Sequence, residues 1–319
     1  MGAKRVFITG MGGYIAGVLC RELTHVDWCG RVYGMDVKKP LAKFGKAEFR
    51  QMDINDPELV SWVAELKPDI FIHLAFIVDP IPDEAKMNRV NVEGTRNALA
   101  AAVAGGSRQV LVASSGTAYG VWPDNPVPLT EASAIRPHPT FKYARDKSEV
   151  EFLCREFMAQ HPEVLMSVIR PCVVYGPLVN NYLSNLLTGL PLIMGIRGYD
   201  PPLQFIHEDD VAGGIIALLE REARGPFNFA PPDTLTVREA VALTKKPALY
   251  LPEKLAEVLI DASWRLQLPL LKAPPSFVDF LRYPWVLDST RLRDEVGYKF
   301  RYSTRETVEI MLRAKGVIT

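Results

Sequence analysis

The stretch that decides the fold is Arg5-Val6-Phe7-Ile8-Thr9-Gly10-Met11-Gly12-Gly13-Tyr14-Ile15-Ala16-Gly17. Its apolar beginning predicts a buried strand, and a helix is expected from Val18 to about Thr24. The turn between them has the spacing Gly10-x-x-Gly13-x-x-Ala16. Glycines let backbone N–H groups approach a pyrophosphate, and the helix N-terminus adds partial positive charge. The stretch therefore predicts a phosphate-binding turn, with a tight turn that holds no ligand as the alternative.

The second expected strand, at residues 32–36, ends in an acidic side chain. Asp36 follows Ala16 by twenty residues, a separation that suits a carboxylate on the ribose of an adenine nucleotide. A carboxylate there repels a 2′-phosphate, so NAD is favoured over NADP. Lys38 and Lys39 follow at once and could bind a phosphate, which keeps NADP as the less favoured cofactor. The structural alternative for Asp36 is a cap on an exposed strand end.

Strand and helix patterns keep alternating beyond this point, which predicts an α/β fold with a doubly wound parallel sheet, the Rossmann fold. Residues 1–170 are expected to form the NAD-binding domain. Residues 171–319 are less regular and are expected to form mainly a smaller substrate-binding region, with segments around 203–222 returning to the first domain. Further strands are expected at residues 49–54, 69–75, 109–113, 165–170 and 227–230, and helices at 57–66 and 84–104.

A phenol and an ammonium stand four residues apart in Tyr143-x-x-x-Lys147. On a helix this spacing puts both side chains on one face. Lowering the pKa of a Tyr from about 10 to about 7 takes roughly 4 kcal/mol. One positive charge at about 4 Å, in a medium with an effective dielectric constant of about 20, supplies roughly that amount. The pair therefore suits proton transfer, and a surface pair on an amphipathic helix is the alternative.

Hydroxyl groups gather at residues 114–120, directly after the expected strand 109–113. The carboxyl ends of strands are where doubly wound sheets bind ligands. Isolated Ser residues in such places are usually turn formers. The Tyr143–Lys147 helix begins soon afterwards, which favours a functional role for Ser115.

The composition excludes several classes of protein. The chain has 319 residues, of which 48% are apolar and 23% charged, and its formal net charge is zero, so no nucleic-acid surface is indicated. The His residues lack metal-ligand spacing, so no metal is expected. The sequence shows no signal-peptide pattern and no C-x-x-C spacing among its four cysteines, which predicts reduced thiols in the cytoplasm.

No apolar run is long enough to span a bilayer, and no membrane partner is expected. The segment at residues 251–271 is amphipathic. A membrane-surface helix is one interpretation of it. Pro269 and the mixed charge favour packing against the rest of the domain instead.

The sequence resembles the extended short-chain dehydrogenase/reductases, the NAD-dependent epimerase/dehydratase group. The motifs of this family occur in the same order in the chain, over residues 5 to about 220. The region from about 230 to 285 matches no motif of the family. The motifs that carry the resemblance are Thr9-Gly10-x-x-Gly13-x-x-Ala16, Asp36, Asp53-Ile54, His73-Leu74-Ala75, Asn91-Val92-x-Gly94-Thr95, Ser114-Ser115-x-Thr117-x-Tyr119-Gly120, Tyr143-x-x-x-Lys147, Arg170-Pro171-x-x-x-Tyr175-Gly176-Pro177 and the Phe205–Ala212 run.

The resemblance implies a role for each matching residue. Tyr143 would be the general acid/base, and Lys147 would lower its pKa and hold the nicotinamide ribose. Ser115 would hydrogen-bond the reacting oxygen, with Thr117 as a second contact. Hydride would pass between a substrate carbon and the cofactor. The residues expected at the cofactor are Gly10, Gly13, Tyr14, Ile15, Asp36, Asp53, Ile54, Leu74, Ala75, Asn91, Tyr143, Lys147 and Pro171.

Departures from the family pattern bear on the substrate. Nucleotide-sugar members usually carry Asn where this chain has Val173, and often an Arg just before the Phe-Ile run, where this chain has Gln204. The loop at residues 79–83 is rich in proline and lacks the usual glycine and polar residues. These changes suit a less charged substrate, as in hydroxysteroid- and flavonoid-type reductases, although Asp146 stands where those enzymes usually have Ser.

The function expected from these features is NAD-dependent oxidation or reduction of a secondary alcohol or ketone in a small molecule. One alternative is a nucleotide-sugar epimerase that keeps its NAD tightly bound. Another is a non-catalytic NAD-sensing protein, although such relatives tend to lose the Tyr or the Lys. The family often dimerises through the helices beginning near Glu84 and Tyr143, so a homodimer is expected.

Overall fold

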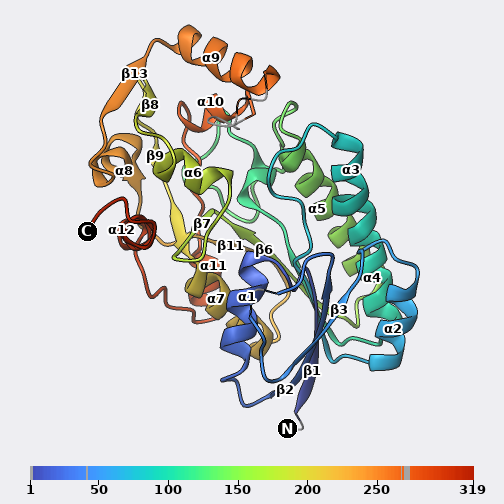
Figure 1. The fold of residues 1–319 in the computed structure, drawn as a ribbon. Coiled ribbons are helices and arrows are strands. Elements are labelled where there is room, and N and C mark those ends of the chain that lie inside the picture. Colours follow the sequence, from blue (N-terminus) through green and yellow to red (C-terminus); the bar gives the residue numbers. More distant parts are fainter. Residues whose placement is uncertain (1–2, 41, 267, 269–273) are drawn as a thin grey trace.

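A seven-stranded parallel sheet forms the centre of the fold in the computed structural model, which describes residues 3–40, 42–266, 268 and 274–319 (Figure 1). The strand order is β11-β6-β5-β4-β1-β2-β3, with the chain crossing from one half of the sheet to the other after β3. This order confirms the predicted doubly wound sheet. The strands are β1 (Lys4–Thr9), β2 (Cys29–Asp36), β3 (Ala47–Gln51), β4 (Ile70–His73), β5 (Gln109–Ala113), β6 (Leu165–Pro171) and β11 (Gly225–Phe229).

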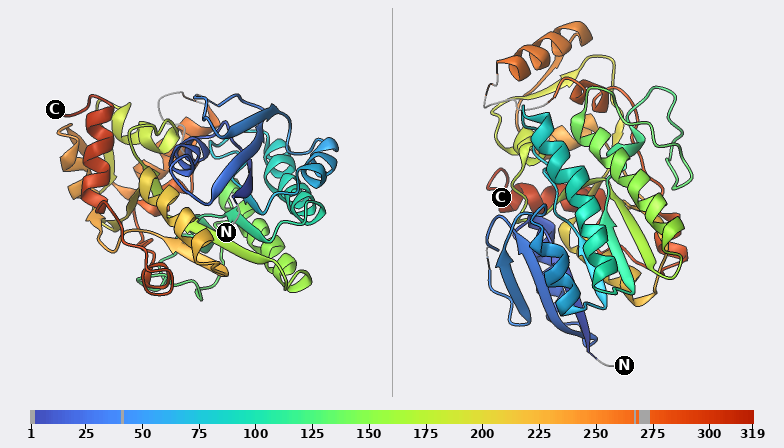
Figure 2. Two further views of the ribbon diagram at one scale, coloured as in Figure 1. Left: turned by 90° about the horizontal axis from the view of Figure 1, so that it is seen from below. Right: turned by 90° about the vertical axis from the view of Figure 1, so that its right-hand side faces the viewer.

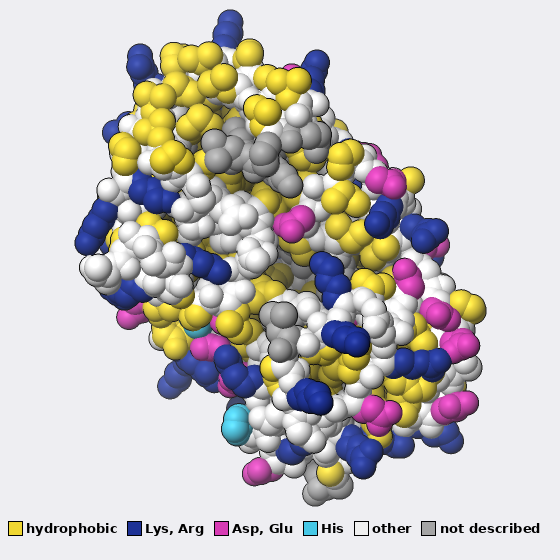
Figure 3. Space-filling model, viewed as in Figure 1, with side chains coloured by type: hydrophobic (Ala, Val, Ile, Leu, Met, Phe, Trp, Pro, Cys, Tyr) yellow, Lys and Arg dark blue, Asp and Glu magenta, His cyan; other side chains and the backbone are white. Residues whose placement is uncertain are grey.

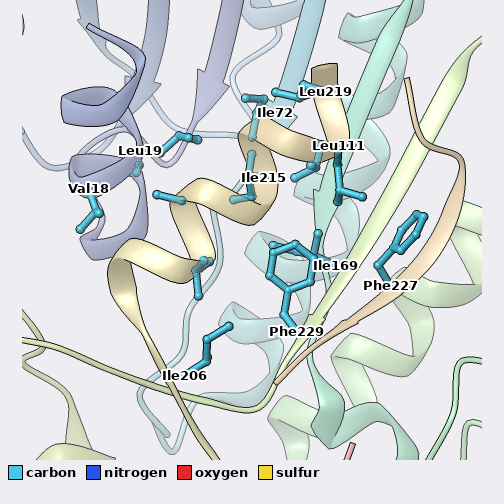
Figure 4. Close-up of a cluster of buried hydrophobic side chains, with 14 of the residues drawn as sticks. Val18, Leu19, Ile72, Leu111, Ile169, Ile206, Ile215, Leu219, Phe227 and Phe229 are labelled. Carbon is cyan, nitrogen blue, oxygen red and sulfur yellow. The ribbon is translucent and has the colours of Figure 1, made fainter. Parts of the chain in front are cut away.

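Helices cover both faces of the sheet, because successive strand residues point to opposite faces and both faces are apolar (Figure 2). Ile72 of β4 faces a layer made by α1 (Tyr14–Leu23) and α7 (Glu208–Glu220), while its neighbour Phe71 faces the other layer. Figure 4 shows Val18 and Leu19 of α1 and Ile215 and Leu219 of α7 in the first layer. The second layer consists of α2 (Glu58–Leu66), α4 (Gly94–Ala104) and α5 (Lys142–Gln160).

Several helices and strands begin or end at other residues than predicted, because backbone conformation and strand pairing set these boundaries. Helix α1 begins at Tyr14 rather than Val18, because Gly13 has the extended backbone of an N-cap. Strand β3 starts at Ala47, where it pairs with Val32 of β2. The helix expected at 84–104 is α3 (Glu84–Asn88), a π-helical turn and α4, and the π-helical turn carries Asn91.

A second region lies beyond the carboxyl ends of the strands (Figure 1). It is built from two-stranded sheets and short helices. The chain returns from it to the main sheet at β11, which follows the segment around 203–222 that was expected to return. The two-stranded sheets pair β7 (Val173–Tyr175) with β10 (Phe205–His207), β8 (Ile193–Ile196) with β13 (Ala248–Leu251), and β9 (Pro202–Leu203) with β12 (Leu235–Thr236). The helices are α6 (Tyr182–Thr188), α8 (Val237–Leu243), α9 (Glu253–Arg265), α10 (Phe277–Phe280) and α12 (Thr304–Ala314), whereas α11 (Thr290–Asp294) packs against β11 of the main sheet. Among the described residues, no helix combines the length and apolar character needed to cross a bilayer.

A buried ion pair fixes α5 to the sheet. The guanidinium of Arg170, on β6, donates to both carboxylate oxygens of Glu151, on α5, at 2.8 Å each. The same guanidinium donates to the Tyr119 hydroxyl at 2.6 Å and to the Glu131 carbonyl at 3.1 Å. Every charged group in this network is therefore hydrogen-bonded, which is the condition for burying charge at low cost.

Replacing one partner of this pair tests how firmly α5 is held. The variant Glu151→Ala should lose about 3–5 kcal/mol of unfolding free energy, since Arg170 is left buried without its counter-charge. Urea unfolding measures this loss. The matched control Glu309→Ala breaks the exposed Glu309–Arg313 pair and should change stability by less than about 0.5 kcal/mol. Equal losses in both variants would mean that the buried pair does not anchor α5.

Candidate active site

The glycine turn after β1 brings backbone segments into close contact. Gly10 has φ +75°, and a Cβ there would lie 2.6 Å from the Ala75 nitrogen. A Cβ on Gly12 would lie 2.2 Å from the Lys38 carbonyl oxygen. Larger residues would therefore force these segments apart. Gly13 ends the turn as the N-cap of α1 without a side-chain cap, so the first N–H groups of the helix remain available to an anion.

The Asp36 carboxylate is held in place beside this turn. Its Oδ2 accepts from the Gly12 N–H at 3.1 Å and its Oδ1 from the Lys38 N–H at 2.9 Å. A carboxylate has further lone pairs for a ribose hydroxyl. The turn and Asp36 together fit the pyrophosphate and adenosine ribose of NAD.

Three of the residues expected at the cofactor make contacts within the protein. Asp53 accepts from the Asn55 N–H at 2.9 Å, and the side chain of Ile54 is buried against Gly94. The Asn91 amide accepts from the Ile77 N–H at 2.8 Å and donates to Asp146 at 2.9 Å. In this geometry their side chains support the neighbouring loops, and direct contact with the cofactor stays a prediction for all three.

Ser115, Thr117 and Tyr143 are brought together as expected. Ser115 follows β5 and caps the short helix Gly116–Tyr119. Its Oγ accepts from the Thr117 N–H at 3.2 Å and from the Thr117 hydroxyl at 3.0 Å, and it is hydrogen-bonded to the Tyr143 phenol. Three hydroxyls thus converge at the carboxyl edge of the sheet, where a single substrate oxygen can be held and protonated.

Lys147 lies one turn beyond Tyr143 on α5 and is buried. Its Nζ donates to the Ala113 carbonyl at 2.6 Å and lies 3.3 Å from the centroid of the Phe76 ring. The same nitrogen is 5.6 Å from the centroid of the Tyr143 ring. Burial lowers the pKa of Lys147 to about 7.

The protein's own groups do not bring the pKa of Tyr143 down toward 7. Burial raises the pKa of Tyr143 to about 12, and the hydrogen bond from Ser115 offsets only part of that rise. The cause is desolvation, which disfavours the phenolate and the ammonium alike. A low phenol pKa therefore requires positive charge beyond that which the protein provides.

Several contacts of the site were not foreseen from the sequence. Phe76 covers the Lys147 ammonium and meets the Tyr143 ring edge-on, with centroids 5.5 Å apart. Trp285 donates its indole N–H to the Gly116 carbonyl at 3.0 Å. An aromatic residue directly after an expected strand end was the only signal for Phe76. Trp285 lies in the region without family motifs, and no local pattern marks it.

A cavity opens next to the hydroxyl cluster and runs beneath α9. It begins at Thr117, Phe141 and Tyr182 and has a volume of about 150 Å³. None of its described lining residues is charged. The remaining lining residues are Val173, Tyr175, Leu183, Leu186, Leu187, Leu190, Ile193, Met194, Gly195, Ile196, Leu203, Gln204, Phe205, Val237, Ala240, Val241, Ala256, Ile260, Phe277, Phe280, Leu281 and Trp285.

Gln204 lines this cavity but is occupied by its own hydrogen bonds. Its amide nitrogen donates to the carbonyls of Pro231, at 2.9 Å, and Leu287, at 3.2 Å. Its amide oxygen accepts from the Leu287 N–H at 2.7 Å. The side chain therefore fixes the chain around residues 231 and 287 and offers little to a ligand.

Comparison with known proteins matches residues 6–230 to the NAD dependent epimerase/dehydratase family. An uncharacterised protein of Mycobacterium tuberculosis is 27% identical, over 98% of this chain and 85% of its own length. The UDP-glucose 4-epimerase of Mycolicibacterium smegmatis is 33% identical, over 54% of this chain and 57% of its own. The structure of MoeE5 with UDP-glucuronic acid and NAD has a TM-score of 0.77 and 22% identity, covering 98% of this chain and 99% of MoeE5. At that identity the structural likeness shows a shared fold.

The buried amine should leave a signature in the pH dependence of stability. The pKa of Lys147 is about 7 in the folded protein against 10.5 for a free side chain, so between these values the unfolded chain binds one more proton. Stability must then rise with pH in this window. From pH 7 to 9 the unfolding free energy of the wild type should rise by about 2 kcal/mol relative to that of Lys147→Met. Urea unfolding at several pH values measures the difference, and parallel curves for the two proteins would contradict a low pKa.

Proposed function

Because the chain belongs to the NAD-dependent epimerase/dehydratase family, we propose that it transfers hydride at a secondary alcohol or ketone carbon of an apolar small molecule. Family membership makes it an NAD-dependent enzyme of the short-chain dehydrogenase/reductase type. The proposal assigns the chemistry to Ser115, Tyr143 and Lys147. The observation that carries it is the hydrogen-bonded Ser115–Tyr143 pair at the end of a cavity without charged lining.

The residues present divide the work of holding NAD. The glycine turn at Gly10 and Gly13 would take the pyrophosphate and Asp36 the adenosine ribose, while Tyr143 and Lys147 would face the nicotinamide ribose. When bound in its oxidised form, NAD supplies a hydride acceptor and a positive charge.

Proton movement in the reaction falls to the protein. In the oxidation direction, the substrate hydroxyl gives its proton to the Tyr143 oxygen as the carbon–hydrogen bond breaks and the carbonyl forms. The Ser115 hydroxyl donates to the same substrate oxygen and fixes its position, and Thr117 orients Ser115 through the bond at 3.0 Å. In the reduction direction, Tyr143 returns the proton to the new alkoxide. These are the roles of a general acid/base and a hydrogen-bond donor.

The substrate class follows from the polarity of the cavity. A diphosphate buried there would meet no cationic side chain among the described lining residues, and burying unpaired charge is costly. Val173 and the internally bonded Gln204 remove the polar groups that nucleotide-sugar members use. An alcohol or ketone on an apolar scaffold fits this surface better than a sugar nucleotide does. Residues 171–319 would supply most of this substrate-binding region.

A nucleotide-sugar epimerase remains the second candidate. The relatives favour it, since one is a UDP-glucose 4-epimerase and the MoeE5 structure holds UDP-glucuronic acid with NAD. The two candidates differ in their use of the cofactor. An epimerase shows no net change in NADH, whereas a dehydrogenase accumulates or consumes it.

The assembly and location proposed for the chain rest on surface features. Phe152 on α5 and Val103 on α4 are exposed apolar side chains on the helices through which the family often dimerises. We propose a homodimer through these helices. The four cysteines are free thiols, which agrees with a cytoplasmic location.

A substrate panel tests the function. The protein with NAD should form NADH with hydrophobic secondary alcohols and should neither oxidise nor epimerise UDP-glucose, as measured by NADH absorbance and by chromatography of the sugar nucleotide. In the control Tyr143→Phe, turnover should fall by about 10²–10⁴-fold while NAD affinity stays nearly unchanged, because only the proton acceptor is lost. Conversion of UDP-glucose without net NADH would establish the epimerase instead. A Tyr143→Phe variant with full rate would remove the acid/base assignment.

Cofactor choice tests the role of Asp36. The variant Asp36→Ala should raise NADP affinity relative to NAD by about tenfold or more, since the repulsion of a 2′-phosphate by the carboxylate is removed. Titration of both dinucleotides measures the ratio of dissociation constants. The exposed Asp27→Ala serves as the control and should leave the ratio unchanged. An unchanged ratio in Asp36→Ala would place the ribose elsewhere.

A further inference from the structure

Helix α9 is apolar on two sides. Ala256 and Ile260 point inward and line the cavity described above. Leu255, Val258 and Leu259 are on the solvent side, with 45, 63 and 42% of their surface exposed. Spacings of three and four residues put these three on one continuous arc. The apolar surface of α9 is therefore wider than the part of the helix that packs against the domain.

The exposed arc continues past the end of the helix. Leu266, the C-cap of α9, is 70% exposed, and Leu268 is exposed as well. Figure 3 shows hydrophobic side chains gathered over the α9 end of the molecule, with Lys and Arg side chains projecting at the margin. We call the set Leu255, Val258, Leu259, Leu266 and Leu268 the α9 patch.

The carboxylates of α9 all take part in ion pairs. Glu253 and Glu257 both bind the guanidinium of Arg282, and Asp261 binds Arg265 at 2.9 Å. Every carboxylate of this helix therefore has a cation within ion-pair distance, with Arg282 shared by Glu253, Glu257 and Asp279.

Exposed cations near α9 lack such partners. Lys254 on the helix, Arg197 after β8 and Lys245 before β13 are exposed and make no ion pair with any described residue. The margin of the patch consequently offers cations, unpaired within the described part of the chain, that can contact the phosphates of an anionic surface.

The size of the patch argues against a second copy of this chain. A helix of 13 residues is about 20 Å long and about 10 Å wide, so one face offers about 200 Å². A stable interface needs about 800 Å² per partner. A bilayer has no such requirement, because the apolar face of a surface helix enters the headgroup boundary and the flanking cations meet the phosphates.

We propose that the α9 patch docks this protein on the surface of a bilayer that contains anionic phospholipid, with α9 lying in the interface. This takes up the interpretation that the sequence left as the lesser alternative for residues 251–271, of which 267 and 269–271 lie outside the described residues. One arc of α9 packs on the domain, as the sequence favoured, and the other is free for lipid. A second consequence rests on the proposed function: an apolar substrate dissolved in the bilayer would enter the cavity directly beneath α9.

Vesicle co-sedimentation of the full chain tests docking without substrate or NAD. The protein should sediment with vesicles of phosphatidylcholine and phosphatidylglycerol, and more weakly with phosphatidylcholine alone. The double variant Val258→Ser/Leu259→Ser should bind at least about tenfold more weakly, because two lipid-facing side chains are lost. Lys254→Glu should weaken binding to the anionic vesicles only. The matched control Val37→Ser/Val127→Ser changes two exposed valines elsewhere on the surface and should bind like the wild type.

The outcomes separate docking from catalysis. An inactive Tyr143→Phe variant should still sediment with vesicles, so a failure of the proposed chemistry leaves docking standing. Absence of binding, or equal binding by wild type and Val258→Ser/Leu259→Ser with matching circular dichroism spectra, overturns the proposal. If light scattering shows that this double variant turns a dimer into a monomer, the patch is an interface between copies instead.

Discussion

Burial of the Lys147 ammonium couples the parts of the active site. The amine has a pKa of about 7, and the same exclusion of water raises the pKa of Tyr143 to about 12. Both groups are thus biased toward their uncharged forms in the protein alone. A phenolate at Tyr143 forms only where further positive charge lies beside the ring. In the mechanism proposed above, proton transfer by Tyr143 would therefore depend on the positive charge of bound NAD.

The placement of this pair depends on a polar stripe along α5. Tyr143, Lys147 and Glu151 follow one another at intervals of four residues, so all three face the sheet. Glu151 is held by the bidentate contact with Arg170 on β6, two turns beyond the phenol. The ion pair fixes the rotation and depth of the helix, and with them the position of the phenol relative to Ser115. A buried ion pair of this kind acts through geometry more than through net stability.

The sequence predicted the sheet and the convergence of Ser115, Thr117 and Tyr143, because glycine spacing, apolar runs and helical periodicity are local signals. It did not predict contacts that join distant segments. The mismatch at Asp146 was visible, but its cause, the hydrogen bond from Asn91 in a π-helical turn, appears only in three dimensions. Phe76 likewise depends on how the loop after β4 settles over α5. The expected Tyr143 pKa, which rests on one positive charge, leaves out the burial of both groups, so it does not describe the protein alone.

The least regular part of the chain decides which substrates can reach this chemistry. Phe280 of α10 meets Phe141 edge-on, with ring centroids 6.2 Å apart, and Trp285 binds the carbonyl of Gly116 between the two hydroxyl residues. The segment from α10 to Trp285 therefore holds both sides of the cavity entrance. The side chains of this segment that line the cavity are apolar, and Gln204 is turned to the backbone. Charge on a substrate would have to be buried without a partner among the described lining residues, which supports the proposed apolar substrate.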